Sequence, residues 1–347
     1  MSPARWQLPA EWDPQSAVLI AWPHSGTDWA ANLAQVESSY VALAGAATRF
    51  QSLLVVAASS ALRTHVQTRL RSAGVDMARV RVVVVDYDDT WLRDSGPITQ
   101  RDGERFRLLD FRFTGWGGKF GASRDDLLIG ALHAQHVFRN AEHERVDFAL
   151  EGGAIEVDGN GTLMSTLTCL HQRHPELSEQ ALCERLGQIF SAAQVVLLKA
   201  GELQGDDTDA HIDTLARFAP DRTIVFQACD DALDPHYPSL AAMRDELAAM
   251  RDVDGHPYRL LPLPWAKPVH AADGRRLAAS YANFLVINGA VLMPAYGDLA
   301  DAEAGRVLAL AFPGREIVAV PARALIEQNG SLHCITMQLP EGVVDVA

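Results

Sequence analysis

Short apolar runs recur along the chain, separated by turn residues, and their composition predicts buried β-strands. The runs are aliphatic or β-branched and bounded by Gly, Pro, Asp or Asn. They span residues 17–22, 53–57, 80–85, 154–157, 195–198, 223–226, 284–287 and 317–320. Between them, helical periodicity predicts helices over residues 33–50, 61–73, 178–190, 238–251 and 301–312. The pattern indicates an α/β fold, although rhythm alone does not distinguish a doubly wound sheet from a radial arrangement.

The domain organisation stays open at this level. A chain of 347 residues is long enough for one large domain or two. The proline-rich stretch at 261–268 is too short and too apolar for a flexible linker. Glycines at 115, 117 and 118 lack the spacing of a nucleotide-binding loop, so no nucleotide cofactor is predicted.

Composition narrows the class of protein. The formal net charge of −14 disfavours nucleic-acid binding and is compatible with cationic small molecules, although acidity also serves solubility. We read no signal peptide at the N-terminus and no apolar run long enough to cross a membrane. Four scattered cysteines indicate a reducing compartment, so we expect a cytoplasmic protein whose oligomeric state the sequence does not reveal.

Four polar motifs carry candidate chemistry. Cys334 lies in Gly-Ser-Leu-His-Cys-Ile-Thr, Asp94 precedes Ser-Gly-Pro, Glu151 precedes two glycines, and His211 and Asp213 end an acidic stretch that begins at Asp206. A thiolate near neutral pH needs a positive neighbour or a positive substrate. Histidine moves protons, and carboxylates match the paired N–H donors of a guanidinium. The set therefore predicts covalent chemistry on a guanidinium carbon.

Spacing supports a common site. In an extended segment His211 and Asp213 would face one pocket. A turn at Pro97 would present Asp94 rigidly, and the glycines after Glu151 would permit close backbone approach. Each residue alone also has a structural explanation, such as a buried thiol or a turn carboxylate.

Two other classes compete with this interpretation. Asp207, Asp209, His211 and Asp213 alternate and could hold a metal, which predicts a metal-dependent hydrolase but leaves Cys334 and Asp94 unexplained. A non-catalytic guanidine-binding protein would need no complete set of Cys, His and carboxylates.

Together the motifs resemble the agmatine deiminase family, within the wider guanidino-group-modifying superfamily. The similarity runs in order from about residue 12 to 338. It rests on the stretches at 21–23, 90–97, 115–118, 150–159, 206–213, 276–284 and 333–336. The resemblance implies a five-bladed pseudo-symmetric α/β-propeller with a central active site, and a single catalytic domain over residues 1–347.

The resemblance also implies roles. Cys334 attacks the guanidinium carbon, and His211 transfers protons. Asp94 and Asp213 hold the guanidinium nitrogens, and Glu151 supports His211 or a substrate nitrogen. No metal or cofactor takes part. Agmatine is the implied substrate, with Trp91 and Trp22 expected to wall its aliphatic chain and Asp207 expected at its distal ammonium.

Departures from the family pattern fall in loops that shape the pocket. Ala210 stands where a glycine is common, only Gly330 remains of a glycine-rich approach to the cysteine, and Ser95 replaces a bulkier residue. None removes a reacting group. The alternative within the same chemistry is a deiminase of peptidyl-arginine or of another guanidine compound.

Overall fold

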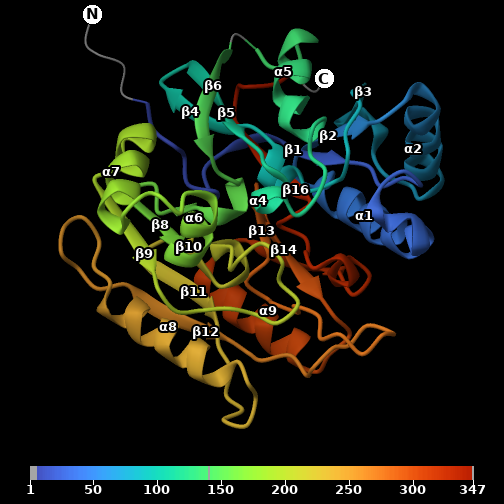
Figure 1. Cartoon of the computed structure of the whole chain (residues 1–347). Helices are drawn as coiled ribbons and strands as arrows, with labels where there is room; N and C mark the ends of the chain where they lie inside the picture. Colours follow the sequence, from blue (N-terminus) through green and yellow to red (C-terminus); the bar gives the residue numbers. More distant parts are fainter. Residues whose placement is uncertain (1–5, 140, 346–347) are drawn as a thin grey trace, which may run out of the picture.

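Five small β-sheets, here called blades, make up the fold in a computed structural model that describes residues 6–139 and 141–345 (Figure 1). Blade 1 holds β16 (Thr336–Pro340), β1 (Gln15–Ala21), β2 (Ser52–Ala57) and β3 (Val80–Val84). Blade 2 holds β4 (Ile98–Asp102), β5 (Arg105–Arg112) and β6 (Ala141–Ala149). Blade 3 holds β7 (Glu156–Val157), β8 (Thr162–Thr166) and β9 (Gln194–Leu198). Blade 4 holds β10 (Ala216–Ala219), β11 (Thr223–Gln227) and β12 (Arg259–Leu263), and blade 5 holds β13 (Leu285–Ile287), β14 (Ala290–Ala295) and β15 (Glu316–Pro321).

Every blade repeats one pairing pattern. An antiparallel pair is followed by a parallel pair, as in β4–β5 and then β5–β6. Parallel neighbours need a crossover, and helices supply it. The crossover helices are α1 (Leu33–Ala47), α2 (Ser60–Ser72), α5 (Leu128–Ala134), α7 (Glu179–Phe190), α8 (Tyr237–Ala249) and α9 (Ala300–Ala311). The repeated unit makes this a five-bladed α/β-propeller, as the resemblance implies.

The two ends of the chain close the ring. β16 pairs antiparallel with β1, so blade 1 contains both the first and the last strand. This closure carries Cys334 to the centre of the molecule, because the cysteine lies two residues before β16 begins.

The local sequence explains the individual elements. The strands β1 and β2 are buried along almost their whole length, as expected where helices cover a parallel sheet. In α7, Ser178 accepts a hydrogen bond from the backbone N–H of Ala181 (3.2 Å) and caps the helix. The same helix buries Leu182, Leu186 and Phe190, four residues apart on one face.

The eight predicted strands and five predicted helices all exist, with one shortened. Residues 152–154 form a 3₁₀ turn, so the strand predicted at 154–157 is reduced to β7. Blade 2 was missed entirely, and in the other blades the strands β8, β10, β12, β14 and β16 were not predicted. No helix in the described ranges is long and apolar enough to cross a membrane. Residues 1–5, part of the segment expected to lack a signal peptide, lie outside the described residues.

Candidate active site

An acidic cavity of about 760 Å³, open mouth included, ends at Cys334 and Asp94. Three aromatic residues, Trp91, Trp116 and Phe120, also line the cavity. Six aspartates line the cavity and no lysine, arginine or histidine does; the aspartates are Asp28, Asp88, Asp89, Asp94, Asp125 and Asp207. The cavity is therefore suited to a cationic ligand with an apolar stem.

Asp94 is held rigidly by the short helix α3 (Leu92–Ser95). One carboxylate oxygen accepts the backbone N–H of Gly153 (3.0 Å), and the other accepts the indole N–H of Trp116 (2.9 Å). Burial raises the pKa of Asp94 to about 6, although His211 beside it acts in the opposite direction. The ionised form of Asp94 would consequently be stabilised by a second cation in addition to His211.

His211 lies between two carboxylates and is fully buried. Its Nδ1 is 3.6 Å from Asp94 Oδ1, and its Nε2 is 3.6 Å from Glu151 Oε2. Burial alone would lower the pKa of His211, but Asp94, Cys169 and Glu151 together raise it well above the ordinary value. Glu151 is held by a buried ion pair with Arg173 (2.7 Å). The imidazole is thus a proton donor in the resting protein.

Gly153 leaves the space that these side chains share. A Cβ atom at this position would lie 2.7 Å from both Asp94 Oδ1 and His211 Nδ1, and 3.2 Å from Asp213 Oδ2. The three groups therefore converge on one point, and the second glycine of the Glu-Gly-Gly motif is there because no side chain fits.

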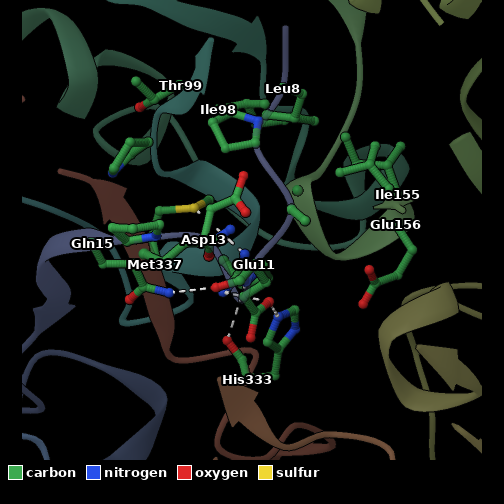
Figure 2. A pocket seen from close by; sticks show the side chains of 18 residues that line it. Leu8, Glu11, Asp13, Gln15, Ile98, Thr99, Ile155, Glu156, His333 and Met337 are labelled. Atoms are coloured by element: carbon green, nitrogen blue, oxygen red, sulfur yellow. Dashed lines mark hydrogen bonds and ion pairs between the residues drawn. The ribbon is translucent and has the colours of Figure 1, made fainter. Parts of the chain in front are cut away.

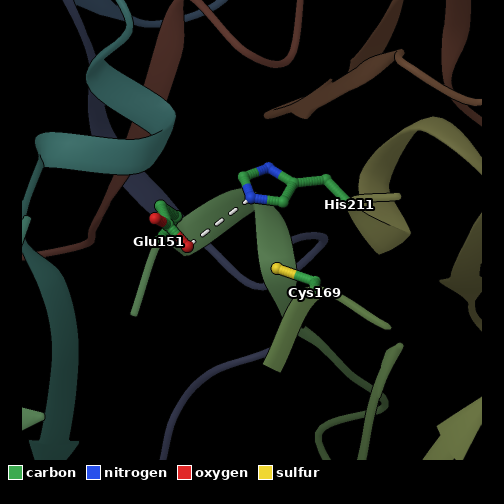
Figure 3. Close-up of side chains that lie close together, drawn as sticks. All are labelled: Glu151, Cys169 and His211. Atoms are coloured by element: carbon green, nitrogen blue, oxygen red, sulfur yellow. Dashed lines mark ion pairs between the residues drawn. The ribbon is translucent and has the colours of Figure 1, made fainter. Parts of the chain in front are cut away.

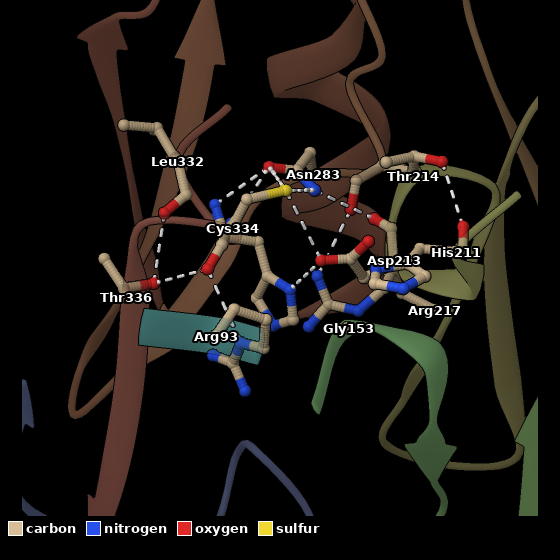
Figure 4. Close-up of polar contacts among 12 residues, drawn as sticks. Arg93, Gly153, His211, Asp213, Thr214, Arg217, Asn283, Leu332, Cys334 and Thr336 are labelled. Atoms are coloured by element: carbon tan, nitrogen blue, oxygen red, sulfur yellow. Dashed lines mark hydrogen bonds and ion pairs between the residues drawn. The ribbon is translucent and has the colours of Figure 1, made fainter. Parts of the chain in front are cut away.

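Cys334 faces Asn283 and Asp213 (Figure 4). Its Sγ accepts a hydrogen bond from the Asn283 amide (3.2 Å) and lies 3.7 Å from Asp213 Oδ2. Burial, with Asp213 and Asp94 nearby, raises the pKa of the thiol well above its ordinary value. The thiol is protonated until something positive enters the site.

A chain of buried charges lies behind Asp213. His333 Nδ1 is 2.7 Å from Asp213 Oδ2, and His333 Nε2 is 2.8 Å from Glu11 Oε2. Arg217 in turn pairs with Glu11 (2.7 Å). Glu11 and His333 also border a second cavity, which does not contain Cys334 (Figure 2). His333 and Cys334, although adjacent in sequence, thus border different cavities. The bond from His333 to Asp213 fixes that carboxylate in place.

The expectation of an extended segment at His211 and Asp213 is wrong. His211 begins a 3₁₀ turn over Ile212–Thr214, and the two side chains meet around Gly153 by that turn instead. Upstream, Asp206 accepts the backbone N–H groups of Thr208 and Ala210.

The four residues of the metal-hydrolase interpretation point to different partners. Asp209 pairs with Lys119 and Arg173, whereas Asp213 bonds to His333. Asp207 instead accepts a hydrogen bond from Asn329 (2.8 Å). This geometry gives no common ligand set for a metal.

The residues expected along the aliphatic chain and at the distal ammonium of the substrate separate into two groups. Trp91 and Asp207 line the cavity. Trp22 does not: it is fully buried, donates its indole N–H to Glu37 (2.8 Å) and packs edge-on against Tyr40. Trp22 directly follows β1, and its backbone N–H still bonds to the carbonyl of Val56 in β2 (2.9 Å), so the structure assigns it to packing and not to the cavity wall.

Comparison with known proteins agrees with this geometry. The family model for Porphyromonas-type peptidyl-arginine deiminases matches residues 7–340. The chain belongs to this family. Over 361 aligned residues it is 34% identical to an agmatine deiminase of Stutzerimonas stutzeri, covering 96% of this chain and 95% of the relative.

Solved structures of the same fold cover nearly the whole chain. A Porphyromonas gingivalis protein, provisionally described as an arginine deiminase, is 43% identical with a TM-score of 0.91 and covers 98% of this chain and 100% of that one. A cysteine-to-serine variant of the C. jejuni agmatine deiminase with substrate bound is 34% identical with a TM-score of 0.90, covering 99% and 98% of the two chains.

Several residues of the site were not predicted. Asn283 and Trp116 lie inside stretches that carried the family resemblance, which was the available signal for them. His333 is next to Cys334, but nothing in the sequence says that it contacts Asp213. Asp88 and Asp89 precede Trp91 by only a few residues, whereas Asp28 and Asp125 are distant and had no local signal.

Proposed function

We propose that this protein is an agmatine deiminase, hydrolysing agmatine to N-carbamoylputrescine and ammonia. The observation that carries the proposal is the cavity itself, which has a thiol at its end, six aspartates on its walls and no basic residue among its lining side chains. Agmatine carries a guanidinium at one end and an ammonium at the other, so both of its ends are cations.

Substrate binding explains how a protonated thiol becomes a nucleophile. Asp94 and Asp213 hold the guanidinium through paired N–H···O contacts. Burial and the two carboxylates raise the pKa of the Cys334 thiol, and the added positive charge offsets the part due to Asp213 and Asp94 and favours the thiolate. The thiol proton passes to solvent through the open cavity that Cys334 lines, because His211 is already protonated, and the thiolate stands near the guanidinium carbon.

The reaction then proceeds in two halves. Cys334 Sγ forms a bond to the guanidinium carbon, and His211 donates its proton to the departing nitrogen as the C–N bond breaks and ammonia leaves. The remaining amidino-thioether is attacked by water, whose proton passes to neutral His211. The second tetrahedral adduct collapses, the C–S bond breaks, and the ureido product departs.

The far end of the cavity favours agmatine over arginine. Arginine carries a carboxylate where agmatine has only hydrogen, and Asp88, Asp89 and Asp207 would repel it. Burial raises the pKa of Asp89 to about 7, and burial with Asp88 and Asp89 nearby does the same for Asp125. A bound ammonium would let these groups ionise, whereas a carboxylate would not.

The test is ammonia release from agmatine, arginine and a peptidyl-arginine side by side, with and without a chelator. The proposal expects turnover of agmatine, weak or no turnover of the other two, and no effect of the chelator. Preference for arginine or the peptide would overturn the substrate assignment and keep the chemistry. If none of the three compounds released ammonia while agmatine still bound, the non-catalytic alternative would be favoured.

We also propose that residues 1–347 act as one catalytic domain in the cytoplasm, without a metal or an organic cofactor. The pairing of the first and last strands in blade 1 supports one domain. The four cysteines are free thiols, which suits a reducing compartment. The oligomeric state stays a prediction to be measured.

A further inference from the structure

Three side chains of different chemistry converge beside the reaction centre. A carboxylate oxygen of Glu151, Sγ of Cys169 and a ring nitrogen of His211 all lie within 4.8 Å of one another, and all three residues are buried (Figure 3). Cys169 comes from α6 (Leu167–Arg173), whose N-cap Thr166 also bonds to the carbonyl of Ala210 (2.7 Å). The cluster therefore sits on a helix tied directly to the loop of His211.

The cluster has free ligand atoms. Among the described residues, both ring nitrogens of His211 and Oε2 of Glu151 are buried without a hydrogen-bond partner. Buried polar atoms are normally paired, so Nε2 of His211 and Oε2 of Glu151, which are unpaired and face each other, mark a position for a ligand, whereas Nδ1 faces Asp94. The deimination scheme engages Glu151 and His211 but leaves the Cys169 thiol without a task.

We propose that Glu151, Cys169 and His211 form an inhibitory site for a thiophilic divalent cation of the Zn²⁺ class. Thiolate, imidazole and carboxylate are the ligands such an ion prefers, and three of them leave a fourth, open position. Ligands of a tetrahedral ion stand roughly 3.4 Å apart. His211 Nε2 and Glu151 Oε2 are already 3.6 Å apart, and Sγ of Cys169, within 4.8 Å of both residues, would have to move by a distance on the order of 1 Å.

Binding would stop the reaction for two reasons. The ion would replace the proton on His211 Nε2 and the proton of the Cys169 thiol, and both protons would go to solvent. The metal-bound imidazole would then be neutral, and the proton left on Nδ1, the atom that faces Asp94, would be held too tightly to pass to the departing nitrogen. Its charge would also compete with the guanidinium for Asp94, which is 3.6 Å from the same imidazole. Inhibition should therefore be competitive with substrate. This inhibitory consequence depends on the proposed function, whereas the binding of the ion does not.

The binding test uses cobalt(II) as a spectroscopic substitute in the full-length Cys334→Ser variant, so that the reacting thiol is absent. We expect one cobalt ion per chain, with the charge-transfer absorption of a thiolate ligand. The band should disappear when Cys169→Ser or Cys169→Ala is added. It should persist with Cys183→Ser or Cys229→Ser, the matched controls. No band in the Cys334→Ser protein, or a band that survives loss of Cys169, would overturn the site.

A kinetic test follows in the protein with Cys334 present. Zn²⁺ should raise the apparent KM for agmatine, a chelator should reverse this, and Cys169→Ser should weaken inhibition about tenfold or more. Equal inhibition with and without Cys169 would place the ion on Cys334 and contradict the proposal. If agmatine were not a substrate, the cobalt spectra would still decide whether the site exists.

Discussion

At the scale of single residues, the reaction depends on carboxylates whose charge is costly in the empty site. Asp94 and Asp213 both raise the pKa of the Cys334 thiol, and burial raises the pKa of Asp94 itself to about 6. A cation between them relieves all three groups at once. The charges of the empty site are thus destabilising, and a bound cationic substrate offsets them.

The first prediction concerns pH. Asp94 must be ionised to hold the guanidinium, and its raised pKa means that protons compete for it below pH of about 6. We expect kcat/KM for agmatine to fall as the pH drops through that range, approaching one decade per pH unit. In Asp94→Asn, kcat/KM should be low over the whole pH range, and its decrease near pH 6 should no longer be seen. A profile that is flat between pH 5 and 7 in the unmodified protein would contradict the assignment.

The second prediction tests His333 as a positioning residue. His333→Asn removes the contact behind Asp213 and lets that carboxylate shift, and misplacement by about 1 Å can cost on the order of a hundredfold in rate. We expect kcat to fall 10- to 100-fold by this reasoning, with a smaller change in KM.

The matched control for His333→Asn is His236→Asn. His236 is equally buried and also bonded to an aspartate (Asp234, 2.6 Å), but it lies away from the cavity of Cys334. That variant should lose stability and keep its kcat. Equal losses of kcat in both variants would mean that His333 is merely structural.

At the scale of elements, the turn at residues 152–154 is the tightest part of the site. We predict that Gly153→Ala abolishes most turnover while the protein stays folded. A Cβ atom there would lie 2.7 Å from two of the catalytic side chains, so Asp94 and His211 must move apart. Activity of Gly153→Ala and of the control should be compared with circular dichroism on both.

Gly45→Ala is the control, in the middle of α1, where a Cβ atom would meet nothing within 4 Å. It should keep full activity and gain about 0.5–1 kcal/mol of stability. Full activity in Gly153→Ala would show that the site does not close around this glycine.

Apolar runs in the sequence predicted the buried strand β2 and failed to predict the partly exposed strand β6. β2 is buried along nearly its whole length and reads as an apolar run. In contrast β6, at the edge of blade 2, has four consecutive exposed polar residues at 142–145 and therefore reads as a loop. The 3₁₀ turn after His211 was missed because two-residue spacing fits a strand equally well. Ala210, flagged as a departure from the family, has a φ of 69°, the left-handed conformation that explains why glycine is common there.

At the scale of the whole molecule, one arginine joins parts of four blades. Arg217 in β10 pairs with Glu11, which precedes β1, and with Glu156 in β7. It also donates to the carbonyl of Phe284 just before β13 (2.7 Å). No sequence pattern predicts this contact, since Glu11 and Arg217 are 206 positions apart. The family resemblance predicted the five-bladed ring. The ion pairs at its centre join residues far apart in sequence, so only the three-dimensional structure reveals them.

Replacing that arginine tests the role of the centre. Arg217→Met leaves the buried Glu156 without its partner and removes the nearer arginine from Glu11, which keeps its contact to a histidine. Breaking a buried ion pair costs about 3–5 kcal/mol. Urea denaturation should show this loss. Arg49→Met is the control, because its pair with Glu316 is about half exposed on both sides and contributes about 0–1 kcal/mol. A similar loss of unfolding free energy in both variants would show that Arg217 does not stabilise the contacts between the blades.

The most direct test of the account is rapid-quench mass spectrometry of the protein during turnover of agmatine. We predict a transient species heavier than the free protein by one agmatine minus one ammonia, mapped by digestion to the peptide that contains Cys334. In Cys334→Ala it should be absent, together with ammonia release. Turnover without such an adduct, or turnover that survives Cys334→Ala, would contradict covalent catalysis by this thiol.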